Sequence, residues 1–187
     1  MVLFLLCVKA ELDGVESLSL LKKGTNLCFS VRNPLNDYEV REKIAFDPQE
    51  TLEQEEGARE DAYHFALKWE GSKKFSTLIV LDDEAAKAAL KKSKKKGGKK
   101  GGGGEVDTPR DVTSDDSGEW VPVLAMECRG LEPYAFHPLG SEFKVVSEGG
   151  AVFDEDVNLS EGDWAEYDEE HDASVSVNEF ESKIIAV

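Results

Sequence analysis

The stretch Val121-Pro122-Val123-Leu124-Ala125-Met126-Glu127-Cys128-Arg129-Gly130-Leu131-Glu132-Pro133 has the pattern of a strand that runs into a tight turn. Its apolar part is bounded by a glycine, after which come an aliphatic residue, a glutamate and a proline. Residues 6–17 follow the same order, with a strand-like run that leads into Gly14, Val15, Glu16 and Ser17. This likeness predicts an internal repeat, although any two amphipathic strands followed by turns share some of it.

Working outward from these two stretches, β patterns fill most of the chain. Before residue 86, strands are predicted at 3–11, 27–32, 40–46, 63–69 and 75–81, and after residue 119 at 121–128, 134–136, 142–146 and 174–187, the last with a bulge near 178–181. Short strands separated by glycine, proline and acidic turns indicate an antiparallel sandwich or barrel. We therefore predict an all-β fold of two related antiparallel halves, residues 1–86 and 119–187, packed as one globular unit.

Between the halves lies a lysine- and glycine-rich segment. It contains Lys91, Lys92, Lys94, Lys95, Lys96, Lys99 and Lys100, followed by four glycines at 101–104. Like charges repel and glycine loses the most backbone entropy on ordering, so residues 87–118 are predicted to be a flexible linker. An alanine-rich run at 84–90 is long enough for two helical turns.

Charge is distributed unevenly along the 187 residues. The formal charge is −17, yet residues 87–104 hold eight lysines and no acid, whereas residues 105–187 hold 22 acidic and four basic residues. An acidic body repels nucleic acid and anionic membrane, so neither is an expected general partner. The lysine run lacks interleaved aromatic or arginine residues for base stacking. We expect it to lie on the acidic body, with nucleic-acid binding or nuclear import as the alternative.

The three cysteines and three histidines form no metal-binding motif, and no two cysteines form a CxxC pair. Ten carboxylates crowd residues 154–172, but Leu159 and Ala165 occupy the positions where a calcium loop needs glycine and glutamate. No catalytic signature of a hydrolase, metalloprotease or phosphate-binding enzyme occurs. Cys128 beside Arg129 is the one candidate for a reactive thiol, although a packed strand cysteine is the simpler interpretation. The apolar start at 1–8 predicts a buried first strand rather than a signal peptide.

The run from Glu127 to Pro133, with Phe136 beyond it, resembles a signature of the eukaryotic CXXC-motif-containing zinc-binding protein family. So does the stretch from Gly150 through Val157 to Asp163 and Trp164. The resemblance covers about residues 121–187 well and the N-terminal half loosely. It implies a pseudo-symmetric, all-β arrangement of two related halves, in agreement with the internal repeat.

The family binds one zinc ion through two CxxC pairs in its N-terminal half. By strand context these pairs fall near residues 33–36 and 67–70, where this chain has Asn33, Asn36, Leu67 and Glu70. Such residues do not form a tetrahedral site of thiolate or imidazole ligands. The resemblance therefore implies a degenerate member that has lost the metal and holds no cofactor. The structural contribution of zinc would then come from apolar contacts of Leu35, Leu67 and Trp69 or from a hydrogen-bonded turn at 33–36.

These observations predict a non-enzymatic, soluble, cytoplasmic protein that binds a protein partner through its acidic half and its lysine segment. A monomer without membrane contact is expected, with nuclear access through the lysines. Two alternatives stay open. One is a small-molecule or redox protein with a cavity between the halves near Cys128, Arg129 and His137, and the other is nucleic-acid binding through the lysine segment.

Overall fold

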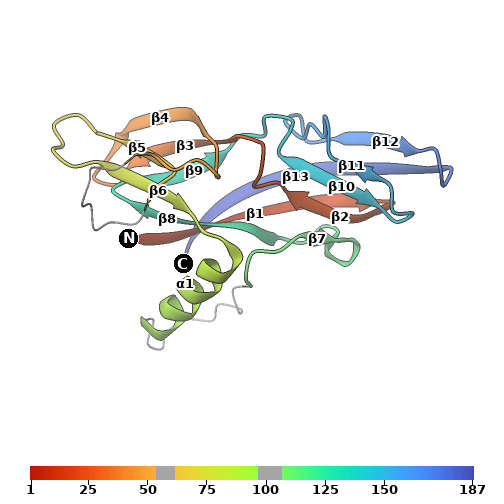
Figure 1. Ribbon diagram of the computed structural model, residues 1–187, viewed down its shortest axis with the longest axis horizontal. Helices are drawn as coiled ribbons and strands as arrows, with labels where there is room; N and C mark the ends of the chain where they lie inside the picture. The colour runs from red at the N-terminus through yellow and green to blue at the C-terminus, as the bar shows by residue number, and fades with distance from the viewer. Residues whose placement is uncertain (54–61, 97–106) are drawn as a thin grey trace.

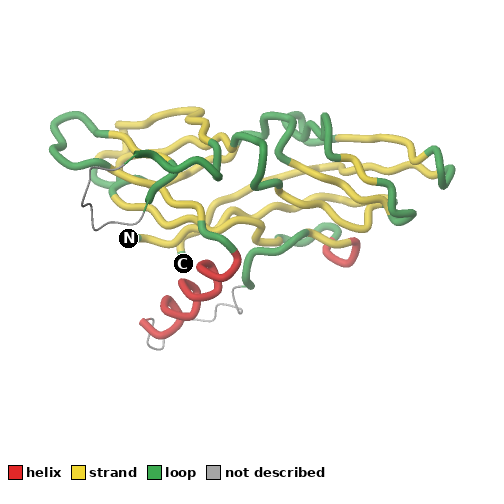
Figure 2. Tube along the Cα trace, in the orientation of Figure 1, coloured by secondary structure: helices red, strands yellow, loops and turns green. Residues whose placement is uncertain are grey.

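The computed structural model describes residues 1–53, 62–96 and 107–187, which form an elongated and almost entirely β molecule (Figures 1 and 2). The strands are β1 (Val2–Asp13), β2 (Val15–Leu20), β3 (Leu27–Asn33), β4 (Asn36–Phe46), β5 (Phe65–Leu67), β6 (Ser76–Val80), β7 (Val112–Thr113), β8 (Val121–Arg129), β9 (Glu132–Phe136), β10 (Phe143–Ser147), β11 (Val152–Phe153), β12 (Trp164–Asp168) and β13 (Ala173–Ala186). The helices are α1 (Asp83–Lys96) and the short 3-10 helix η1 (Ser114–Asp116). The predicted antiparallel all-β fold is confirmed.

The strands form three antiparallel sheets. The central sheet has the order β12-β13-β1-β8-β6-β5, and smaller sheets have the orders β11-β10-β2-β7 and β4-β3-β9. In Figure 1 the β4-β3-β9 sheet lies at the left with β5 and β6, whereas β2, β10, β11 and β12 lie at the right. We call these ends lobe A and lobe B, and the long strands β1 and β13 run between them.

The strand pairing is nearly symmetric about the β1·β8 pair. Exchanging β1–β6 with β8–β13 leaves the order of the central sheet unchanged, because β1·β13 becomes β8·β6 and β12·β13 becomes β5·β6. It also converts the β2·β10 pair into β9·β3 and the β3·β4 hairpin into β10·β11. The internal repeat is thus confirmed, and each lobe includes one strand of the other repeat, β9 in lobe A and β2 in lobe B.

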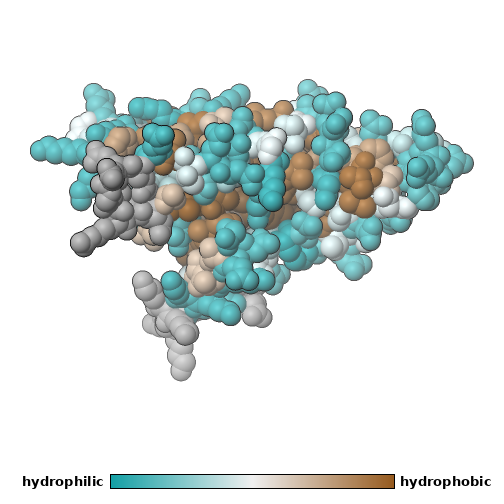
Figure 3. All heavy atoms as spheres, viewed as in Figure 1, coloured by the Kyte–Doolittle hydropathy of each residue, from teal (hydrophilic) through white to brown (hydrophobic). Residues whose placement is uncertain are grey.

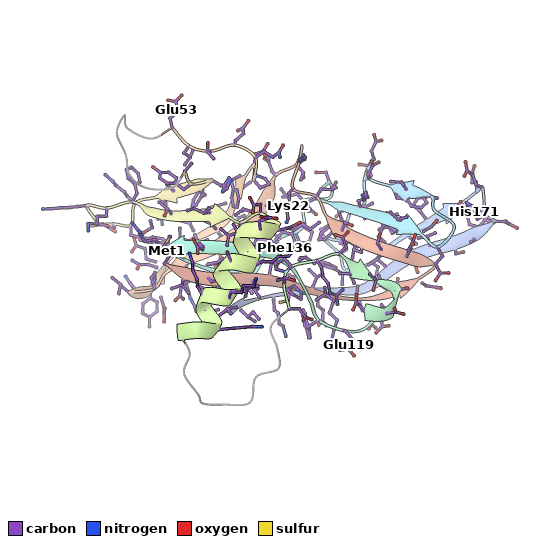
Figure 4. The ribbon with its side chains drawn as sticks, turned by 60° about the horizontal axis from the view of Figure 1, so that its bottom comes forward. Met1, Lys22, Glu53, Glu119, Phe136 and His171 are labelled. Atoms are coloured by element: carbon purple, nitrogen blue, oxygen red, sulfur yellow. The ribbon has the colours of Figure 1, made fainter. Side chains whose placement is uncertain are left out.

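The core is continuous across both lobes. Strand β1 is buried on both faces, so its first eight residues are nearly all apolar. Phe136, labelled near the middle of the molecule in Figure 4, belongs to a chain of rings whose neighbouring centroids are 5.2–6.2 Å apart. In order from lobe A to lobe B, these rings are Phe65, Phe46, Phe29, Phe136, Phe143 and Phe180. Hydrophilic residues cover most of the face in Figure 3, with apolar atoms visible between them.

The predicted linker at 87–118 is wrong for most of its length. Residues 87–96 belong to α1, which packs Ala86 and Leu90 on Leu5 and Ala125 of the central sheet. Alanine and lysine are strong helix formers, and the Asp82 side chain caps the helix by accepting a hydrogen bond from the Ala85 N–H at 2.8 Å.

Residues 107–118 are also ordered. They contain β7 and η1, where a double hydrogen bond joins the guanidinium of Arg110 to the carboxylate of Asp116. Residues 97–106, including the four glycines, lie outside the described residues. Within the described residues, no helix is long and apolar enough to cross a membrane.

The glycines between β1 and β2 and between β8 and β9 occupy equivalent positions with positive φ. Gly14 has φ +67° and Gly130 has φ +70°, and a Cβ added at Gly14 would lie 2.4 Å from the carbonyl oxygen of Ser174. A Cβ at Gly130 would lie 2.5 Å from the Ser76 hydroxyl oxygen. The turns at Gly14 and Gly130 therefore contact the neighbouring strands β13 and β6 directly.

Alanine substitution at these glycines should destabilise the fold to a graded extent. We expect Gly14→Ala to lower the free energy of unfolding by about 3 kcal/mol and Gly130→Ala by about 2 kcal/mol, since backbone yields less readily than a serine side chain. Gly24→Ala is the matched control, because Gly24 has φ +66° but no atom within 4 Å of an added Cβ. Its cost should be about 1 kcal/mol, from backbone strain alone. Urea unfolding measures all three, and equal costs would contradict the close packing of the turns.

Candidate functional site

The outer end of lobe A, which we call pole A, is formed by the turn between β3 and β4 and the loop between β5 and β6. In the turn, the side-chain oxygen of Asn33 accepts a hydrogen bond from the Leu35 N–H at 3.0 Å. The side-chain oxygen of Asn36 accepts one from the Tyr38 N–H at 3.3 Å. Asparagine commonly makes such bonds to the backbone two residues on, so the turn is fixed by its own sequence.

The carboxylate of Glu39 joins the two loops of pole A. One of its oxygens accepts a hydrogen bond from the Asn33 side-chain amide at 2.8 Å, and the other accepts one from the Glu70 N–H at 2.6 Å. The bonds from Asn33 and Glu70 hold the pKa of Glu39 below its ordinary value. Sequence reasoning missed Glu39, because its only local signal is a charged residue on the inward face of an edge strand.

The residues around this carboxylate differ in what they contact. Trp69 is buried, and its indole N–H donates a hydrogen bond to the Gly130 carbonyl at 2.7 Å while the Arg41 guanidinium lies 5.5 Å from the ring centroid. Leu67 packs half-buried against the main core. Leu35 is 94% exposed, so the predicted apolar contact from this residue is wrong. Trp69 and the hydrogen-bonded turn behave as predicted.

A zinc ion does not fit the four positions, 33, 36, 67 and 70, at which the resemblance predicts its ligands. The side-chain oxygens of Asn33 and Asn36 are already bonded to backbone N–H groups, and Leu67 offers only hydrocarbon. Glu70 alone has a side chain that commonly binds zinc. Across residues 1–53, 62–96 and 107–187, no three histidine, cysteine, aspartate or glutamate side chains gather into a group that could hold a metal ion.

The outer end of lobe B, pole B, carries a similar carboxylate tie. The pairings Phe65↔Leu78 and Trp164↔Val177 are equivalent in the two repeats, which aligns residue 69 with Asp168. The Asp168 carboxylate accepts a hydrogen bond from the Ser147 hydroxyl at 2.9 Å and lies 2.9 Å from the ring nitrogen Nδ1 of His171. It thereby joins the β10–β11 turn to the β12–β13 loop. Figure 4 shows His171 and Glu53 toward opposite ends of the molecule.

The contacts of the run at 127–133 are structural. Cys128 is 1% exposed, and burial raises the pKa of its thiol far above the ordinary value. The side chain of Glu132 forms an ion pair with Arg32 at 3.0 Å. Leu131 and Pro133 are buried. Gly130 lies in the turn between β8 and β9, and Glu127 and Arg129 lie on β8.

Other predicted site residues lie apart from this run. Asp163 accepts a hydrogen bond from the Glu179 N–H at 2.9 Å, and Trp164 packs its ring edge-on against Phe153. The hydroxyl of Ser30 lies 2.7 Å from the ring nitrogen Nε2 of His137. The three surface hollows described, of about 430, 530 and 340 Å³, are not lined by Cys128, Arg129 or His137. The alternative of a reactive Cys128 beside a cavity is therefore not supported.

The lysines are placed along the outward side of α1. Lys91, Lys92 and Lys94 are exposed, as is Lys87 one turn before Lys91. The backbone of Lys95 and Lys96 ends the helix, whereas Lys99 and Lys100 lie outside the described residues. In Figure 1 the helix stands below the central sheet, and Lys92 lines the same surface hollow as Glu127, a residue of the acidic half.

Comparison with known proteins agrees with this fold. The family described as CXXC motif containing zinc binding protein, eukaryotic, matches residues 5–185. The Drosophila melanogaster UPF0587 protein CG4646 is 45% identical over 73 residues, which are 39% of this chain and 44% of that protein. The Bos taurus CXXC motif containing zinc binding protein is 38% identical over 72 residues, which are 38% of this chain and 44% of the relative. The matched part thus spans less than half the length of these relatives.

Solved structures match over the whole chain. A structure titled as a hypothetical protein from Plasmodium falciparum has a TM-score of 0.77 and 24% identity, and covers 99% of this chain and 100% of that one. A structure titled C1orf123 has a TM-score of 0.75 and 19% identity, and covers 99% of each chain. At these identities the likeness shows the fold. With the family match over residues 5–185, the chain belongs to the eukaryotic CXXC motif containing zinc binding proteins.

Proposed function

We propose that this chain is a metal-free member of its family and works as a non-enzymatic protein-interaction module. The observation that carries the proposal is the Glu39 carboxylate, which joins by hydrogen bonds the two loops where the family's ligands fall. A zinc ion bound by two CxxC pairs would connect the same two segments. Glu39 thus supplies the connection without the metal.

Pole B supports this interpretation of pole A. There the Asp168 carboxylate joins the equivalent pair of loops, with Ser147 and His171 as its partners. The family resemblance places no zinc ligands at this end, and the two lobes have the same strand pairing. A carboxylate is therefore a sufficient tie for this type of loop pair, and lobe A uses the same solution.

An interaction role is supported by the distribution of charge and by what the site lacks. Lys87 and Lys91 stand one helical turn apart on the exposed side of α1, whereas residues 105–187 carry 22 acids against four bases. The exposed lysines of α1 and the surplus of acids in residues 105–187 favour docking to partners of complementary charge. Cys128, the strongest candidate for chemistry, is buried and protonated.

The metal-free proposal predicts a protein without stoichiometric zinc whose melting temperature is unaffected by a chelator. Elemental analysis of the purified chain and thermal unfolding with and without the chelator measure both. Glu39→Ala should lower the melting temperature, because it removes the tie between the loops. Glu42→Ala is the matched control, since Glu42 is exposed on the same strand. Stoichiometric zinc, together with a chelator-induced loss of folding, would refute the proposal.

The same tie predicts a pH dependence. The pKa of Glu39 is lower in the folded chain than in the unfolded chain, so its charged form stabilises the fold above the ordinary glutamate pKa of about 4.3. This contribution disappears as the pH falls through the lowered pKa. The difference in unfolding free energy between wild type and Glu39→Gln should therefore shrink between about pH 5 and pH 3. A difference that stays constant over this range would mean that the carboxylate charge is not involved.

The interaction role predicts salt-sensitive capture of a protein from native extract. Binding through α1 should disappear in Lys87→Glu/Lys91→Glu and persist in the charge-conserving control Lys87→Arg/Lys91→Arg. It should also weaken steeply near 1 M salt, where the screening length falls to about 3 Å. Quantitative mass spectrometry of the captured proteins measures the effect. A chain that retains nothing above an inert protein at low salt would contradict an interaction role.

A further inference from the structure

We infer that pole A is a docking site for a protein partner, in which Leu35 and Tyr38 enter an apolar cleft. This inference rests on the proposed function and names the surface that carries it. Leu35 is 94% and Tyr38 is 96% exposed, which are the highest values among the exposed large hydrophobic residues of the described chain. Scattered apolar residues are ordinary on a surface, but two almost bare side chains in one turn are typical of a binding anchor.

The turn fixes the backbone that carries both side chains. The Leu35 and Tyr38 N–H groups donate to the side chains of Asn33 and Asn36, and Glu39 anchors Asn33 to the backbone of Glu70. An ordered tip loses little conformational entropy when it binds. The hydrogen bonds that tie pole A together therefore also prepare its tip for a partner.

The fold itself does not require an apolar tip. The pairs Phe29↔Phe136 and Leu20↔Phe143 are equivalent, which aligns residue 35 with Gly149. The pairs Arg32↔Val40 and Val146↔Val152 then correspond, so Val40 rather than Tyr38 is the equivalent of Val152. The β10–β11 turn thus closes with two glycines, Gly149 and Gly150, where the β3–β4 turn has Leu35 and Asn36. Because one repeat makes the turn without a large side chain, Leu35 is not needed to form it.

Charge beside the tip indicates the chemistry of the partner. The β5–β6 loop carries Lys68, Lys73 and Lys74 against the single acid Glu70, and the Lys68 ammonium lies 4.5 Å from the ring centroid of Phe75. A complementary cleft has an apolar floor and carboxylates on the side that faces this loop. Asp37 is exposed between the two apolar residues and calls for a hydrogen-bond donor. A flat anionic membrane would repel Asp37, so these observations favour a protein.

The test compares two variants of the full chain as bait in native extract. The tip variant is Leu35→Ser/Tyr38→Ser, and the control is Val152→Ser, because Val152 is an apolar residue that is 56% exposed beside the equivalent turn at pole B. Both should melt at the wild-type temperature. We expect at least one protein that wild type and control retain equally and that the tip variant retains about tenfold less.

The protein identified in this way is then purified and titrated against each bait. Its affinity should fall about 30-fold for the tip variant, as for loss of a binding hot spot, and several-fold for Lys73→Glu/Lys74→Glu. Equal capture and affinity for wild type and tip variant would overturn the inference. So would tip-dependent binding to vesicles of phosphatidylcholine and phosphatidylserine without any tip-dependent protein.

These outcomes separate the inference from the proposed function. Capture that survives in the tip variant but disappears in Lys87→Glu/Lys91→Glu overturns the docking site at pole A and leaves the interaction role standing. A wild-type bait that captures nothing overturns both. Stoichiometric zinc together with tip-dependent capture overturns the metal-free proposal and leaves the docking site.

Discussion

The antiparallel pairing of β1 with β8 is the constraint on which the rest of the structure depends. It is the one pair that the exchange of the two repeats maps onto itself, and every other strand pair of the described residues except β2·β7 has a counterpart on the opposite side of it. Each repeat places its second strand, β2 or β9, in the other lobe, so neither lobe is complete with the strands of one repeat. β1 also supplies both cores, with Leu6 on one face and Leu5 on the other. Formation of this pair thus couples both lobes into one cooperative unit.

Much of the fold could be predicted from the sequence, because period-two and continuous apolar runs identify strands directly. The long C-terminal strand and its bulge near residue 179 are confirmed, where the register shifts between Lys9 and Glu11. The similarity of residues 6–17 to 124–133 correctly indicated the repeat. The placement of β2 and β9 in the lobe of the other repeat could not be predicted, since it depends on pairing between segments more than a hundred residues apart.

The predictions that differ from the structure concern highly charged segments. The seven lysines in residues 91–100 suggested a chain unable to pack, but Ala86 and Leu90 just upstream supply an apolar face for the helix. Lysine prefers helix once such a face is buried, because its own side chain stays in water. Similarly, β12 lies within the acidic stretch 154–172, where no strand is predicted, and the buried Trp164 anchors it. At pole A, the asparagine turn was predictable from local chemistry, whereas the role of Glu39 depends on a contact with residue 70.

The symmetry of the repeats also makes the strand arrangement compatible with circular permutation. Residues 3 and 187 are joined by a backbone hydrogen bond, and the two chain ends lie side by side in Figure 1. Because β13·β1 is the equivalent of β6·β8, a short link from residue 187 to residue 1 would take the place that the α1 connection holds in the other repeat. A new chain break between β6 and β8 would then give a circularly permuted chain in which the second repeat comes first. The same fold is therefore compatible with either order of the two repeats along the chain.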